Sequence, residues 1–181
     1  MQAFTKRPIH WLAFYRAQPT LNTQALRAFS AATEKRFRVL GLQQVALGNL
    51  NKGDLSHFWH DVLGLKKVKS FTSEKENVDE DVLKVGKGIL GTIEVDIMAP
   101  LNPEKSPKVH IPALNHIGLW VDDLELAVKQ LEDQGIRCVG GIRPGASGFD
   151  ITFVHPKSAC GVLLELVQAP DYVIQEFDSK P

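Results

Sequence analysis

The feature that most constrains this chain is a short pattern that occurs twice. Residues 42–50 read LQQVALGNL, and residues 114–122 read LNHIGLWVD. Each copy has a leucine, two polar residues and then alternating small and apolar positions, which is typical of a half-buried strand. Downstream of each copy the chain reaches a strand-like segment that runs into Ala-Pro, at residues 95–100 and 165–170. The chain therefore predicts two similar modules, each opening with one of the copies.

Each module is predicted to contain one strand, one helix and three further strands. In the first, Asp54 can cap a helix that Gly64 ends; in the second, Asp122 and Glu125 form a capping-box pattern and Gly135 closes the helix. A strand-rich repeat of about 70 residues excludes a helical solenoid and favours a fused, pseudo-symmetric pair. We expect an α+β fold of two βαβββ modules. The later strands are expected at 66–72, 80–86 and 90–98, and at 136–141, 149–155 and 161–168.

The domain organisation follows from these patterns and from the charge distribution. We expect modules at 40–100 and 113–172, a proline-bearing linker at 101–112 and a C-terminal tail at 173–181. Residues 1–33 carry four basic and no acidic residues, whereas the remainder carries 17 basic and 21 acidic ones. A basic, amphipathic start is typical of a mitochondrial transit peptide, so residues 1–35 predict import into the matrix. The alternative is a native N-terminal helix of a cytoplasmic protein.

Bulk composition excludes several functional classes. The net charge is zero and no apolar run is long enough to span a bilayer, so neither nucleic acid nor membrane is an expected partner. Cys138 and Cys160 lack metal-ligand spacing, and we interpret them as thiols of a reducing compartment.

Polar residues recur at equivalent places in the two modules. Gln44 and His116 occupy the same slot of the two first strands, and alternation puts each beside small residues on one face. In the closing strands, Asp96 and Glu165 stand at corresponding positions, and Glu165 lies among apolar residues. A carboxylate in such surroundings costs several kcal/mol unless it is paired, protonated or metal-bound. If symmetry brings these four side chains together, they form an oxygen and nitrogen set suited to Mn²⁺, Co²⁺, Ni²⁺ or Zn²⁺.

These residues lie in segments that resemble the vicinal oxygen chelate superfamily, which pairs βαβββ modules in a curved sheet around a metal-binding cup. The closest resemblance is to the methylmalonyl-CoA epimerase family, over about residues 40–172. It rests on VDIMAPLN, on LNHIGLWVDDLELAV and above all on HPKSACGVLLELVQAP. The resemblance implies metal ligands at Gln44, Asp96, His116 and Glu165.

The sequence departs from that family at two of the four ligands. The epimerases usually have histidine at the position of Gln44, and Glu or Gln at the position of Asp96, for which Glu94 is the substitute. A Gln-first pattern resembles glyoxalase I of animals and plants. That enzyme normally has an arginine, which grips glutathione, at the position of Gly48.

The resemblance also implies catalytic residues. Glu165 is expected to act as one base as well as a ligand, and Asp81 as the second base, with Glu80 and Asp79 as alternatives in the same acidic run. Weaker candidates are His155 and Lys157, near the expected substrate entrance, and residues 145–148, a flexible loop over the substrate. His57 and His60 form a histidine pair on the first helix, and we interpret them as surface residues.

We therefore expect a metal-dependent epimerase that acts on the α-carbon of an acyl-CoA thioester such as methylmalonyl-CoA, as a homodimer by analogy with the superfamily. The alternatives are a glyoxalase I-like lyase acting on a glutathione hemithioacetal, and a non-catalytic binding protein of the same fold. An extradiol dioxygenase is disfavoured because Gln44 removes one of its usual histidine ligands.

Overall fold

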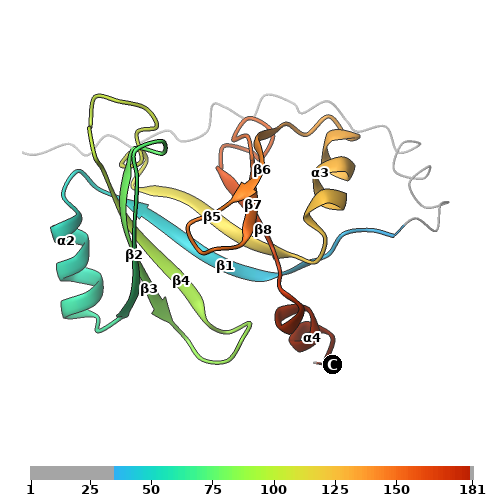
Figure 1. The fold of residues 1–181 in the computed structure, drawn as a ribbon, viewed down its shortest axis with the longest axis horizontal. Coiled ribbons are helices and arrows are strands. Elements are labelled where there is room, and N and C mark those ends of the chain that lie inside the picture. The colour runs from blue at the N-terminus through green and yellow to red at the C-terminus, as the bar shows by residue number, and fades with distance from the viewer. Residues whose placement is uncertain (1–34, 180–181) are drawn as a thin grey trace, which may run out of the picture. The chain divides into compact units, whose positions relative to one another are not determined.

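The computed structural model describes residues 35–179, which form one mixed sheet of eight strands with a few helices (Figure 1). The segment on which the targeting expectation rests lies outside the described residues, apart from Lys35. The strands are β1 Val39–Gly48, β2 Lys66–Ser73, β3 Val78–Val85, β4 Ile93–Pro100, β5 Leu114–Val121, β6 Cys138–Pro144, β7 Asp150–Val154 and β8 Leu164–Gln168.

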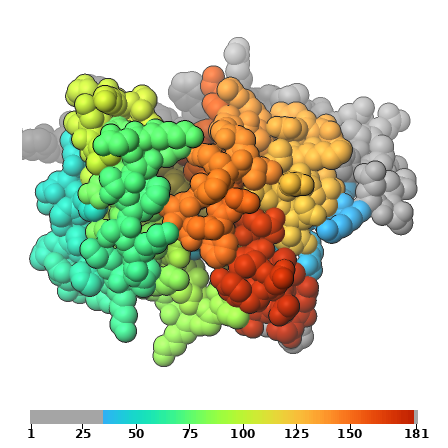
Figure 2. Space-filling model, in the orientation of Figure 1, coloured from blue at the N-terminus to red at the C-terminus, as the bar shows by residue number. Residues whose placement is uncertain are grey.

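The strand order, β2-β3-β4-β1-β5-β8-β7-β6, repeats itself about its centre. Within each module the first and last strands run parallel, β1 with β4 and β5 with β8. The antiparallel pair of β1 and β5 joins the modules. Figure 2 shows the two halves, green and orange, side by side. The predicted fold of two βαβββ modules in one curved sheet is confirmed, because the two duplicated strands form its centre.

Both predicted module helices are present, with different caps from those expected. Helix α2 (Lys52–Ser56) continues into the π-helical turn η1 (His57–Val62), and its cap is Asn51, whose Oδ1 accepts from the Gly53 N–H at 2.9 Å. Helix α3 (Leu124–Glu132) is capped by Asp123, which has an extended backbone, and not by Asp122. The Asp122 carboxylate instead accepts two hydrogen bonds from Arg38, each 2.7 Å long.

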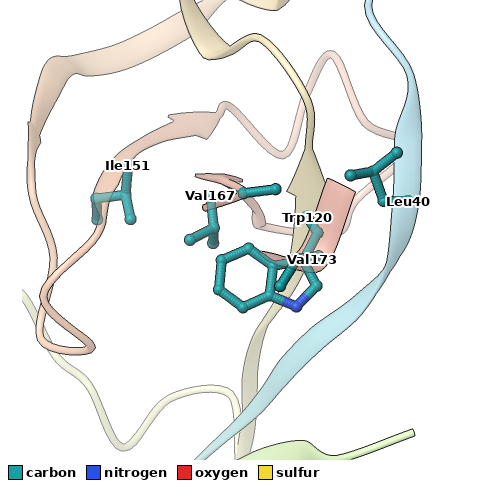
Figure 3. Close-up of a cluster of buried hydrophobic side chains, with 6 residues drawn as sticks. Leu40, Trp120, Ile151, Val167 and Val173 are labelled. Carbon is teal, nitrogen blue, oxygen red and sulfur yellow. The ribbon is translucent and has the colours of Figure 1, made fainter. Parts of the chain in front are cut away.

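A helix that the sequence pattern did not predict, α4 (Asp171–Ser179), follows the last strand. It covers one end of the sheet, where Val173 joins a buried cluster with Leu40, Trp120 and Val167 (Figure 3). Among the described residues, no helix has the length and apolar character needed to cross a membrane.

The other two helices cover the convex face of the sheet and leave the opposite face open. Leu55 of α2 and Trp59 of η1 pack with Leu83 and Ile97, and Leu124 and Ala127 of α3 pack in a second buried cluster. Apolar burial of this kind stabilises a fold by about 25 cal/mol per Å². It fixes which residues of each strand face inward, because neighbouring residues of a strand point to opposite faces.

Candidate active site

The concave face of the sheet contains a cavity of about 510 Å³. Its walls are mostly apolar and come from both modules. Its polar lining includes Gln44, His116 and Glu165, together with Glu80. A largely apolar cavity with a few converging polar groups is the usual form of a small-molecule site. The lining residues that carry the apolar wall include Phe71, Val78, Met98, Val109, Val139, Ile151, Phe153 and Leu163.

Three of the four expected ligands meet in this cavity. The Gln44 amide nitrogen lies 2.9 Å from His116 Nε2 and donates to Glu165 Oε2 at 2.5 Å, and His116 Nε2 is 3.4 Å from the same Glu165 oxygen. The contact requires Gly118, because a Cβ there would lie 2.7 Å from Gln44 Cγ. Strands β1, β5 and β8 are neighbours in the sheet, so the repeat brings these side chains together.

Asn115 determines how His116 is presented. Its side-chain oxygen lies 2.8 Å from His116 Nδ1, and its amide nitrogen donates to the Val109 carbonyl. The hydrogen-bond network therefore assigns the proton to Nδ1 and leaves Nε2 with a lone pair directed at Gln44 and Glu165. This is the tautomer that a metal-binding histidine needs. Sequence reasoning missed Asn115, since nothing in the pattern distinguishes it from an ordinary strand asparagine.

The fourth expected ligand, Asp96, does not line the cavity. It lies buried on β4, on the same concave face of the sheet as Gln44. One of its oxygens has no hydrogen-bond partner among the described residues. Burial first, and then the charges of Glu80, Glu94 and Glu165, raise the pKa of Asp96 well above its usual range. Its substitute, Glu94, is held by Gln43 at 2.9 Å and by Lys84 at 3.4 Å. The unpartnered oxygen favours Asp96 over Glu94 as the donor.

Of the three candidates for the second base, Glu80 lines the cavity. It pairs with Met98 across β3 and β4, so it shares the concave face. Asp81 points to the opposite face, where Ser70 donates to it at 2.7 Å and Lys52 and Lys67 lie at 3.3 and 3.6 Å. Burial raises the pKa of Asp81, but Ser70 and the two lysines outweigh it and lower the pKa below its usual value. Asp79 forms an ion pair with Lys52 at 2.6 Å.

Glu80 is an unusual carboxyl group. It is 6% exposed, and one of its oxygens has no hydrogen-bond partner in the described part of the chain. Burial raises its pKa to about 7, and the charges of Glu165 and Glu94 add to the effect. A carboxyl group that titrates near neutral pH can both accept and return a proton, which is what general acid–base catalysis requires.

The weaker candidates fall in different places. Residues 145–147 line the cavity, and Lys69 of β2 contacts the Ala146 carbonyl. His155 accepts from the Lys157 backbone N–H at 3.1 Å, and neither residue lines the cavity. On the first helix, the exposed His57 and His60 contact Asp61 and the Leu65 carbonyl.

The donor set fits a divalent cation. Among residues 35–179, no group of three or more His, Cys, Asp or Glu side chains is arranged to hold a metal ion. The set at this site is different, because its third member is the amide of Gln44. The lone pairs of His116 and Glu165 converge on the amide nitrogen of Gln44. A half-turn of the amide group would put its oxygen, a ligand for hard or borderline cations, at this point, and the unpartnered oxygen of Asp96 remains available.

Comparison with known proteins agrees with this fold. Residues 43–153 match the model of the Glyoxalase/Bleomycin resistance protein/Dioxygenase superfamily. The chain is 32% identical to the mitochondrial methylmalonyl-CoA epimerase of Homo sapiens over 143 residues, which cover 71% of this chain and 81% of that protein. The corresponding Mus musculus enzyme is 33% identical over 132 residues, 69% of this chain and 70% of that protein.

Solved structures are similar as well. A methylmalonyl-CoA epimerase from Mycobacterium tuberculosis superimposes with a TM-score of 0.63 and 29% identity, over 75% of this chain and 93% of that one. The Streptomyces coelicolor epimerase, bound to 2-nitronate-propionyl-CoA, has the same fold with a TM-score of 0.66 and 22% identity, over 73% of this chain and 99% of that one. The chain therefore belongs to the Glyoxalase/Bleomycin resistance protein/Dioxygenase superfamily, and the four relatives described above are methylmalonyl-CoA epimerases.

Proposed function

We propose that this protein is a methylmalonyl-CoA epimerase, which inverts the α-carbon of the acyl group. The observation that carries the proposal is the pair of carboxyl groups in one apolar cavity. Glu80 comes from the first module and Glu165 from the second, and both line the cavity. They are close enough for the charge of Glu165 to raise the pKa of Glu80.

Epimerisation needs two groups that exchange a proton with opposite faces of one carbon. In the proposed reaction, one carboxylate removes the α-proton and the other carboxyl group delivers a proton from the other side. Each step transfers one proton and leaves the C–C and C–S bonds intact. Because both carboxyl groups are nearly buried, the reacting carbon is held in an apolar cavity, and burial brings the pKa of Glu80 to about 7, which suits proton transfer near neutral pH.

We further propose that Gln44, Asp96, His116 and Glu165 hold a divalent metal ion. When bound, such an ion would polarise the substrate carbonyl and stabilise negative charge on its oxygen. Asn115 would keep the His116 ring in the required tautomer. The departure of two ligands from the usual epimerase pattern gives three oxygen donors and one nitrogen, which suits Mn²⁺ as well as Co²⁺.

Proton exchange in D₂O tests the proposal. The full-length protein with Mn²⁺ is given methylmalonyl-CoA, and deuterium at the α-carbon is followed by NMR. We expect metal-dependent exchange that falls by roughly 10²- to 10⁴-fold in Glu165→Gln. Glu80→Gln should lose epimerisation but still exchange the proton of one epimer, because one base remains. The matched control is Asp81→Asn, whose side chain faces the other side of the sheet.

The outcomes separate the alternatives. Normal epimerisation by Glu80→Gln would overturn the two-base assignment. An absence of exchange in protein that binds metal would favour a glutathione hemithioacetal as the substrate. That is the glyoxalase I-like alternative, which Gln44 supports. Against that reading, a Cβ at Gly48 would lie 1.9 Å from the Val109 carbonyl oxygen, so no arginine fits there.

We also propose that the protein is mitochondrial and forms a homodimer. The human and mouse relatives are mitochondrial enzymes, and residues 1–33 have the composition of a transit peptide, which together support import into mitochondria. A fluorescent fusion at the C-terminus, with and without residues 1–33, tests this. A homodimer is proposed from the superfamily alone, and light scattering on the purified protein gives the mass.

A further inference from the structure

Arg143 lies in the cavity with unused hydrogen-bonding capacity. It belongs to the part of the cavity wall that the second module contributes, and its Nη1 is buried without a hydrogen-bond partner among residues 35–179. Its Nη2 is 3.6 Å from Glu76 Oε1, too far for a hydrogen bond. Leaving a buried charged donor unsatisfied costs more than leaving a neutral one, so this guanidinium is suited to an anionic partner.

A bulge in β6 determines the position of Arg143. The pairing of β6 with β7 is interrupted between Val139 and Arg143, and Gly140 in this bulge has φ of +83°. A Cβ at Gly140 would lie 2.6 Å from Arg143 Nη1, so a side chain there would displace the guanidinium from its present position. Bulges of this kind re-aim side chains next to functional sites.

Aromatic contacts connect Arg143 to His116, one of the proposed metal ligands. Its guanidinium carbon lies 5.3 Å from the centre of the Phe153 ring, and that ring meets His116 edge-on with centroids 5.3 Å apart. A single ring therefore separates the guanidinium from the histidine. Stacking holds the planar group in one orientation and lowers the entropic cost of a bidentate hydrogen bond.

The charges of the cavity define what Arg143 can bind. Three carboxyl groups line it, Glu76, Glu80 and Glu165, against two cations, Arg143 and Lys108. An acyl group with its own carboxylate would be repelled by the glutamates unless a cation faced it. A planar guanidinium is the side chain that matches a carboxylate with two parallel hydrogen bonds.

We propose that Arg143 binds the free carboxylate of the acyl group and makes the site selective for CoA thioesters of dicarboxylic acids. The proposal rests on the proposed function and deepens it. In the free protein Glu76 makes only a weak ion pair with the guanidinium, 3.6 Å apart, and the substrate carboxylate competes with Glu76 for Arg143. Arg143 is therefore a residue of specificity, whereas Glu80 and Glu165 exchange the proton.

Calorimetric titration of two thioesters tests this. Malonyl-CoA and acetyl-CoA differ by one carboxylate and carry the same CoA, and their affinities are measured for full-length protein with Mn²⁺. Arg143→Gln should reduce the preference for malonyl-CoA over acetyl-CoA by roughly 10- to 100-fold, the range for a charge-assisted pair. Arg143→Lys should restore part of it, and Arg137→Gln, an exposed arginine just before the same strand, should change nothing.

Glu76→Gln distinguishes ligand binding from a structural role. If Arg143 binds the carboxylate, removing its competitor should tighten malonyl-CoA by up to about fivefold, the limit for a partly exposed ion pair. If the pair merely closes the cavity, Glu76→Gln and Arg143→Gln should both weaken binding, and the proposal is overturned. Equal weakening of both thioesters by Arg143→Gln would overturn it too, since that result assigns the arginine to CoA.

The proposed function can fail independently. Its readout is α-proton exchange by the wild-type protein, which does not involve acetyl-CoA or the Arg143 variants. Exchange with an unchanged malonyl-CoA preference in Arg143→Gln overturns the specificity assignment alone. A wild-type protein that binds neither thioester overturns both.

Discussion

Replacing the buried Glu80 by glutamine should stabilise the folded protein at alkaline pH while removing epimerisation. Glu80 has its pKa raised from 4.5 to about 7, chiefly by burial and then by Glu165. Between those two pH values the folded state holds a proton that the unfolded chain has released. The free energy of unfolding therefore falls as the pH rises through this window.

The magnitude follows from the shift. One pKa unit corresponds to about 1.36 kcal/mol, so the ionised Glu80 costs the fold about 3 kcal/mol once the pH exceeds 7. Glutamine has nearly the same shape and carries no charge. Glu80→Gln should leave the free energy of unfolding almost unchanged at pH 4.5 and raise it by about 3 kcal/mol at pH 8.

Urea denaturation at several pH values provides the assay. The protein is treated with chelator, because a bound cation would favour the ionised carboxylate and hide the effect. Glu74→Gln, an exposed glutamate in the turn before Glu80, is the matched control and should not show the pH dependence. An equal change in the free energy of unfolding at pH 4.5 and pH 8, or a destabilisation at pH 8, would refute the conclusion that Glu80 is a buried carboxyl group with a pKa of about 7.

Three further predictions concern the site and its support. Gly118→Ala should displace Gln44 and lower Mn²⁺ affinity by roughly 10- to 100-fold in a titration, with an unchanged circular dichroism spectrum; unchanged affinity would remove Gln44 from the ligand set. Trp120→Ala should lower the free energy of unfolding by about 3–5 kcal/mol in urea, and a loss below 1 kcal/mol would show that α4 does not depend on this ring. Asp81→Asn should retain epimerisation measured by NMR, and its loss would return the second-base role from Glu80 to Asp81.

The repeat made much of this molecule predictable from its sequence. Alternation along the two similar strands indicated that Gln44 and His116 share a face with small residues, and the equivalent positions of the closing strands selected Glu165. A strand has a period of two, so these assignments require only the correct register. The two modules, their helices and the convergence of Gln44, His116 and Glu165 followed from that register.

The choice among Asp79, Glu80 and Asp81 could not be made from the sequence, since three consecutive acids differ only in the face they occupy. The pairing of Glu80 with Met98 puts Glu80 on the concave face, and the contacts with Lys52, Lys67 and Ser70 hold Asp81 on the opposite face. The caps were misjudged for a similar reason. Neighbouring Asp122 and Asp123 are equivalent in a motif, and only the contact with Arg38, which is distant in sequence, separates them.

The sequence by itself determined the duplicated architecture and three of the polar groups at its centre, because periodicity and symmetry are local properties that the chain carries. The tertiary structure decided what depends on contacts between distant segments. These contacts raise the pKa of Glu80 and determine the tautomer of His116. They also leave one oxygen of Asp96 without a partner and form the bulge next to Arg143 in the cavity wall. Burial and charge at each of these groups come from strands that meet only when the sheet curves.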